Sequence, residues 1–166
     1  MGIEIERKFR AANDGWRALA DPARATRIAQ GYLSRDPERI VRVRLETPIA
    51  SDAADVGRGT LTIKGLNRGA TRPEYEYPIP AADARELLGL CSGHAIAKVR
   101  WRIDAGAQAV FEIDVFESPH AGLVLVEIEL ARENQDFVRP PWLGAEVTGD
   151  PRYTNAALAV SASPPA

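Results

Sequence analysis

The sequence predicts an α+β fold in which an antiparallel sheet of eight strands closes, or nearly closes, into a barrel with helices packed outside. Eight segments alternate charged and apolar residues, as in β-strands, whose successive side chains point to opposite faces. The charged face carries few Ser, Thr, Asn or Gln residues, unlike an ordinary solvated face. Its charges are also sorted, since whole strands are basic or acidic. A barrel with a charged interior accounts for this pattern.

The strands are expected in order at residues 3–9, 27–34, 39–46, 60–65, 72–80, 95–104, 109–117 and 122–131. In the first strand, "IEIERKF", Glu4, Glu6 and Lys8 alternate with apolar residues. The third, fourth and sixth strands are basic and the fifth, seventh and eighth are acidic. The residues on this face are Arg42, Arg44, Lys64, Lys98, Arg100 and Arg102, and Glu74, Glu76, Glu112, Asp114, Glu127 and Glu129.

The segments between the strands predict few helices. Residues 81–90 favour a helix with a leucine stripe, and residues 152–160 favour a closing helix. Residues 13–26 are rich in turn formers and suit a short helical piece, while residues 47–59 predict a loop. We expect a single domain over residues 1–160 and a disordered tail over 161–166.

An open sheet with its polar face in water is the alternative interpretation. In the barrel interpretation, so many interior charges need partners, because burying a lone ion costs several kcal/mol even after relaxation. They would need each other, bound metal and a polyanionic ligand.

Composition excludes several classes of protein. The net charge of −2 gives no reason to expect a nucleic-acid partner, and no apolar run is long enough to cross a membrane. Cys91 is the only cysteine, so neither an internal disulfide nor a cysteine zinc site is expected. Charged residues from Glu4 onward argue against a signal peptide. We expect a cytoplasmic monomer or homodimer.

The charged face predicts a particular chemistry. Clustered Glu and Asp without His or Cys suit a hard cation, Mg²⁺ or Mn²⁺. Inward Lys and Arg suit phosphate oxygens, which Arg can bind through two parallel hydrogen bonds. Metal-binding acids beside phosphate-binding bases are the general arrangement for phosphoryl transfer.

A series of motifs spans nearly the whole chain. They are "EIERK" (4–8), "QGYL" (30–33), "VRVRL" (41–45), "LTIKG" (61–65), "RPEYEYPI" (72–79), "AKVRW" (97–101), "FEIDVF" (111–116), "LVEIEL" (125–130) and "EVTGDPRYTNAALA" (146–159). In this order they resemble the CYTH domains, the triphosphate tunnel metalloenzymes. The resemblance implies an eight-stranded antiparallel tunnel and divalent-metal-dependent hydrolysis or cyclisation of a triphosphate. The short bacterial branch, which this sequence resembles most, implies hydrolysis of inorganic tripolyphosphate to pyrophosphate and phosphate.

The resemblance also implies roles for individual residues. Glu4 and Glu6 would bind the metal together with Glu127 or Glu129. The phosphates would contact Lys8, Arg42, Arg44, Lys64, Lys98 and Arg100. Lys8 contacts the terminal phosphate or helps to activate water, and we favour phosphate binding because neighbouring carboxylates oppose the lowered pKa that a base needs.

The remaining candidates support this site. Asp114 and Glu112 would hold a second metal or orient basic side chains. Glu74 and Glu76 are supporting carboxylates. Tyr32 would contact the substrate or pack.

Three other functions stay open. A class IV-type adenylate cyclase would need a pocket for adenine and ribose. A thiamine triphosphatase would need an aromatic cage. A polyphosphate-binding module without turnover would not need so many carboxylates.

Overall fold

The computed structural model describes residues 5–51, 56–66, 73–106, 109–132 and 135–165. Its strands are β1 (Ile5–Ala11), β2 (Ala25–Ser34), β3 (Arg39–Pro48), β4 (Arg58–Gly65), β5 (Glu74–Ile79), β6 (Ser92–Gly106), β7 (Ala109–Phe116), β8 (Val124–Leu130) and β9 (Leu143–Glu146). The helices are α1 (Ala81–Gly89) and α2 (Asn155–Leu158), with short 3-10 helices η1 (Asp14–Leu19), η2 (Pro22–Arg24) and η3 (Pro151–Tyr153). The predicted α+β class is confirmed.

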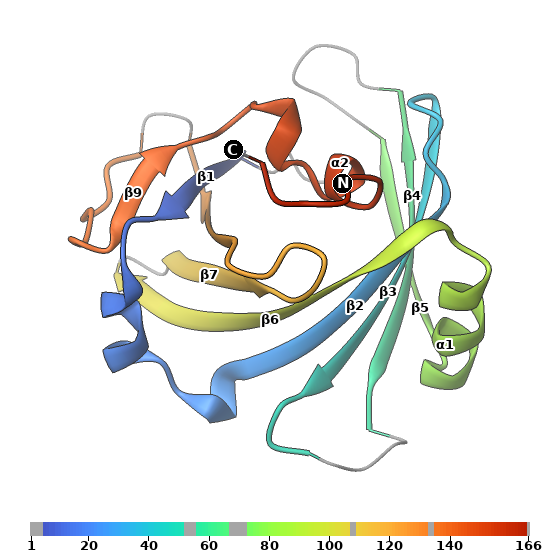
Figure 1. The fold of residues 1–166 in the computed structure, drawn as a ribbon, viewed down its shortest axis with the longest axis horizontal. Coiled ribbons are helices and arrows are strands. Elements are labelled where there is room, and N and C mark those ends of the chain that lie inside the picture. Colours follow the sequence, from blue (N-terminus) through green and yellow to red (C-terminus); the bar gives the residue numbers. More distant parts are fainter. Residues whose placement is uncertain (1–4, 52–55, 67–72, 107–108, 133–134, 166) are drawn as a thin grey trace.

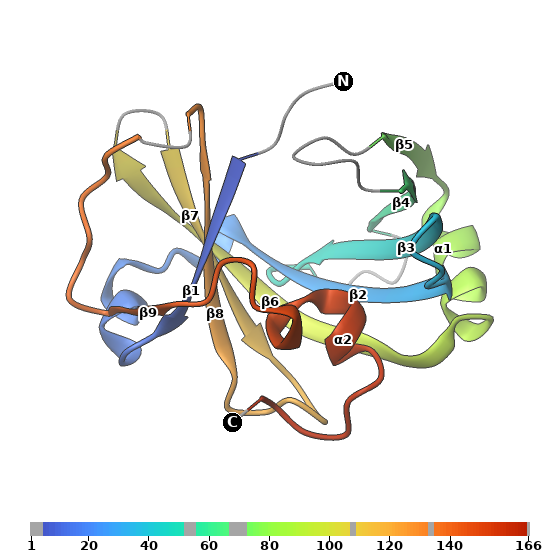
Figure 2. The ribbon, with the colours of Figure 1, turned by 90° about the horizontal axis from the view of Figure 1, so that it is seen from above.

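The nine strands form one antiparallel sheet in the order β5-β4-β3-β2-β6-β7-β8-β1-β9. It curves strongly, so that β1, β7 and β8 stand opposite β3, β4 and β5 (Figures 1 and 2). Two details of the prediction are corrected: the sheet has nine strands rather than eight, and β5 and β9 do not pair in the described ranges. Within the described ranges the fold is therefore an open cup with β5 and β9 as its edge strands, and β9 pairs with β1 across an irregular register between Phe9 and Ala11.

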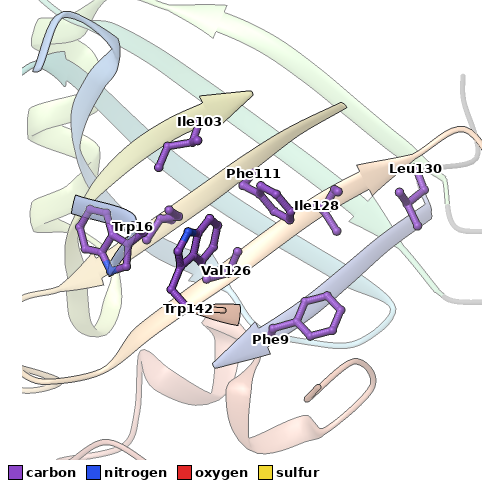
Figure 3. Close-up of a cluster of buried hydrophobic side chains, with 9 residues drawn as sticks. Phe9, Trp16, Ile103, Phe111, Val126, Ile128, Leu130 and Trp142 are labelled. Atoms are coloured by element: carbon purple, nitrogen blue, oxygen red, sulfur yellow. The ribbon is translucent and has the colours of Figure 1, made fainter. Parts of the chain in front are cut away.

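The alternating pattern puts one apolar face on the outside of this cup. There Phe9, Ile113 and Ile128 are fully buried in a cluster with Trp16 from η1 and Trp142 (Figure 3). Full burial of each such side chain contributes about 1.5–3 kcal/mol relative to exposure. At the other side of the molecule, α1 covers the outer face of β2, β3 and β4 (Figure 1). The prediction that helices pack outside the sheet is therefore confirmed for α1.

The inner face is charged along only part of its length. At one end it carries a second apolar cluster, in which Tyr32, Phe116 and Leu125 pack against Tyr153 and Leu158. Those last two residues belong to η3 and α2, which lie within the curve of the sheet (Figure 1). The C-terminal segment therefore fills one end of the interior. In the described part of the chain, no helix is long and apolar enough to cross a membrane.

Candidate active site

The charged inner face encloses a cavity of about 850 Å³. Most of the predicted site residues line it: Glu6, Lys8, Tyr32, Arg42, Arg44, Lys64, Glu74, Glu76, Arg100, Glu112, Glu127 and Glu129. Lys98 and Asp114 are not among its lining residues, and Glu4 lies outside the described residues. The strand register contributes to the gathering, because several neighbouring strands place charged residues of this face directly opposite each other. Such pairs are Glu6 with Glu129, Lys8 with Glu127, Lys64 with Glu74, Arg100 with Asp114, and Glu112 with Glu127.

One side of the cavity, which we call the basic wall, consists of Arg42, Arg44 and Lys64 on β3 and β4. The neighbouring acidic strand β5 supplies partners for it on the same face, since Lys64 Nζ lies 2.8 Å from Glu74 Oε2. Arg42 Nη2 donates to Glu76 Oε1 at 3.2 Å. Glu74 and Glu76 are therefore placed to orient Lys64 and Arg42.

Arg44 in the middle of the basic wall has a different support. Its Nε and Nη2 atoms donate to Oε1 of Gln30 at 3.2 and 3.1 Å. Burial lowers the pKa of Arg44 below its ordinary value, and the charges of Arg42 and Arg100 lower it further. The guanidinium is therefore a cation that a bound anion would stabilise.

Arg100 on β6 joins the two halves of the cavity. It donates to both oxygens of Asp114 at 2.7 Å, to Glu127 Oε2 at 2.7 Å and to Glu112. Burial alone would lower the pKa of Arg100, but the charge of Asp114 and its hydrogen bonds, together with Glu127, raise it well above the ordinary value. Its charge is fixed and shared among three carboxylates.

Lys98 and Asp114 lie beneath this network, with 0% and 1% of their side chains exposed. Lys98 Nζ donates to Asp114 Oδ2 at 2.5 Å and to Asn155 Oδ1 of α2 at 3.4 Å. Burial lowers the pKa of Lys98, whereas Arg100 and Lys98 hold the pKa of Asp114 below its usual range despite burial. Both Asp114 oxygens are already hydrogen-bonded, which favours orientation of basic side chains over metal binding. Lys98, predicted to contact phosphate, has its ammonium on this buried pair instead.

Lys8 lies opposite Glu127 in the β1–β8 register. Its Nζ is 3.0 Å from Glu127 Oε1 and 3.5 Å from Glu6 Oε1. Burial would lower the pKa of Lys8, but the charges of Glu127 and Glu6 outweigh burial and raise it. A lysine that keeps its proton this firmly suits anion binding and does not suit a general base.

The acidic wall, defined as Glu6, Glu127 and Glu129 on β1 and β8, lines the same cavity as the basic wall. Its strands β1 and β8 stand opposite β3 and β4 of the basic wall (Figure 2). Glu127 is buried and committed to Lys8 and Arg100. Glu6 and Glu129 are opposite each other in the register and both exposed, and no ion pair of Glu129 is found among the described residues. Two facing carboxylates offer the hard oxygen donors that Mg²⁺ and Mn²⁺ prefer. The described residues hold no cluster of three or more metal-ligating side chains, and Glu4, predicted as a further carboxylate ligand, lies outside them.

Several lining residues escaped prediction. Glu46 and Arg58 lie where the sequence predicted a strand end and a loop, and Thr154, Asn155 and Ala156 come from the C-terminal segment. Gln30 is neutral and buried, so charge alternation did not identify it. The sequence signal that was available for Gln30 is its place in the motif "QGYL" (30–33) of an expected strand, whereas the register that sets it opposite Arg44 is known only from the structure.

The chain matches the model of the CYTH domain over residues 2–154. The chain belongs to the CYTH family. It is 42% identical over 159 residues to an inorganic triphosphatase of Acetivibrio thermocellus, covering 95% of this chain and 94% of that one. It is 36% identical to an inorganic triphosphatase of Nitrosomonas europaea, covering 95% and 97%. A crystal structure of an inorganic triphosphatase aligns with a TM-score of 0.67 and 33% identity over 97% of each chain. The family predicted from the motifs is confirmed.

Proposed function

We propose that this CYTH protein hydrolyses inorganic triphosphate to pyrophosphate and phosphate with the help of a divalent cation. The observation that supports this most directly is the single cavity with a basic wall facing an acidic wall. The predicted activity agrees with the activity named for both relatives, which are similar along nearly their entire lengths.

The chain's own residues have distinct tasks in this proposal. Arg42, Arg44 and Lys64 bind the phosphate oxygens and stabilise the charge that develops on them. Lys8, which keeps its proton, binds the end of the substrate that lies near the acidic wall. Asp114 and Glu112 hold Arg100 in place.

The cation would be held by Glu6 and Glu129 together with Glu4. Oxygen ligands and open exposure favour Mg²⁺ or Mn²⁺ at this place. When bound, the cation neutralises phosphate charge and lowers the pKa of water. We propose Glu129 rather than Glu127 as the β8 ligand, because Lys8 and Arg100 already engage Glu127.

The lining of the cavity argues against the alternatives. Among the described residues, Tyr32 is the aromatic side chain that lines it, and Tyr32 is 5% exposed because it packs in the inner apolar cluster. An adenine ring or a thiazolium ring would lack an aromatic surface to stack on there. This supports an inorganic substrate over ATP or thiamine triphosphate.

The test is release of phosphate from tripolyphosphate, ATP, thiamine triphosphate and pyrophosphate, each with Mg²⁺, Mn²⁺ or EDTA. We expect metal-dependent release that is fastest from tripolyphosphate. Formation of cyclic AMP from ATP would show that the protein is a cyclase rather than a hydrolase. Tight binding of tripolyphosphate without turnover of any substrate would leave a binding module.

Four further expectations are kept as proposals. They are a single domain over residues 1–160 with a disordered tail at 161–166, a monomer or homodimer, a cytoplasmic location, and no nucleic-acid or membrane partner. They rest on composition and on the strand pattern, and size measurement in solution tests the oligomeric state.

A further inference from the structure

The arginines of the cavity differ in what balances their charge. Arg100 is bound by three carboxylates, and Arg42 and Arg102 each bind one, at 3.2 and 3.0 Å. Arg44 instead donates two hydrogen bonds to the neutral amide of Gln30. A carboxylate oxygen of Glu46 lies 3.9 Å from Arg44 Nη1, at the outer limit of an ion pair. Of these four arginines, Arg44 therefore has the most distant carboxylate partner.

Gln30 itself does not line the cavity. It lies on β2 directly opposite Arg44 and is 0% exposed. Because Arg44 donates two N–H groups to it, the side-chain oxygen of Gln30 must face the guanidinium. The Nε2 group of Gln30 is consequently buried without a hydrogen-bond partner among the described residues.

An unpartnered buried N–H group destabilises a folded protein. A glutamate at position 30 would have no such group and would form a charged pair with Arg44. The neutral amide therefore orients the guanidinium without cancelling its charge, although its own Nε2 group stays unpartnered.

We propose that Gln30 is a positioning residue, which aims the Arg44 guanidinium into the cavity while leaving its charge uncompensated for a phosphate oxygen of the substrate. This inference rests on the proposed function, since it assumes a phosphate chain in the cavity. Burial and the nearby charges of Arg42 and Arg100 make the unliganded Arg44 cation costly, and a bound anion relieves that cost.

The first test is Gln30→Glu in the full chain, with binding of tripolyphosphate measured by calorimetry in EDTA. The new carboxylate neutralises Arg44, so we expect Kd to rise roughly tenfold or more. The Tm without ligand should stay equal or rise, because the unpartnered group is gone. A structural role alone predicts an unchanged Kd. The matched control is Asn13→Asp, which adds the same charge at an exposed cap far from the cavity lining and should leave Kd unchanged.

Gln30→Met is the second variant, because it removes the hydrogen-bond acceptor without adding a charge. It also provides the test of the proposal if Gln30→Glu fails to fold. We expect Kd to rise by several-fold and by less than in Gln30→Glu, because Arg44 loses its alignment and keeps its charge. The proposal would be overturned if both variants fold and bind tripolyphosphate with the wild-type Kd. If Gln30→Glu does not fold, a wild-type Kd in Gln30→Met alone would overturn it. So would a wild-type protein that does not bind tripolyphosphate. Binding that follows these expectations without hydrolysis in Mg²⁺ would refute the proposed function and leave the role of Gln30 supported.

Discussion

The substitution Asp114→Asn tests whether the buried network under the cavity stabilises the fold. Asp114 is 1% exposed and accepts hydrogen bonds from Lys98 at 2.5 Å and from Arg100 at 2.7 Å on both oxygens. Removing one partner of a buried ion pair costs about 3–5 kcal/mol. In a chain of this size 1 kcal/mol lowers Tm by about 2–4 °C, so we expect Tm to fall by about 6–20 °C. We expect a fall in Tm near the lower end of this range. Burial already lowers the pKa of Lys98, so in the variant Lys98 can release its proton and leave no unpaired charge.

The assay is thermal unfolding at several pH values, with Asp104→Asn as the matched control. Asp104 pairs with Arg24 at 3.0 Å, but the Asp104 side chain is 77% exposed. The Tm of the Asp104→Asn variant should therefore stay near that of wild type. The pKa of Asp114 lies below its ordinary value of 3.8, so its charge stabilises the fold above that pH. This contribution is lost as pH falls further through the folded-state pKa. The Asn variant should therefore lose less stability than wild type on acidification below about pH 4. Equal Tm shifts in the two variants would refute the reasoning.

Four further outcomes are expected. Glu129→Gln should reduce metal-dependent phosphate release by about 100-fold or more with little change in Tm, whereas Glu127→Gln should lower both, because Lys8 and Arg100 lose a buried partner. Glu4→Gln or Glu6→Gln should abolish metal-dependent turnover in a folded protein, and full activity in both would contradict the metal assignment. Lys8→Gln should slow turnover by about 100-fold, and since the wild-type pKa of Lys8 is raised above 10.5, no rise in rate from Lys8 deprotonation should be seen between pH 8 and 10. Gly93→Ala should destabilise the fold by about 1–3 kcal/mol in denaturant titrations, because φ is +82° and the new Cβ would lie 2.6 Å from the carbonyl oxygen of Ala159.

The alternation of charged and apolar residues identified the long strands, because successive side chains of a β-strand point to opposite faces of the sheet. It missed β9, whose sequence "LGAE" is too short to show a pattern and which depends on pairing with β1. The alternation of charged and apolar residues also does not show how deeply a charged side chain is buried. Lys98 and Arg100 have the same place in the pattern, yet Lys98 lies under α2 and Arg100 lines the cavity. That difference comes from the C-terminal segment folding back into the cup.

The position of β1 in the sheet has a consequence for the order of events during synthesis. β1 ends at residue 11, but its partners β8 and β9 begin at residues 124 and 143. At a synthesis rate of about 5–20 residues per second, β1 waits about 6–23 s for the start of β8. Four of its seven residues are charged, which discourages aggregation of an unpaired strand. Two of these four charged residues, Glu6 and Lys8, later line the site, so the same charges serve the nascent chain and the folded protein.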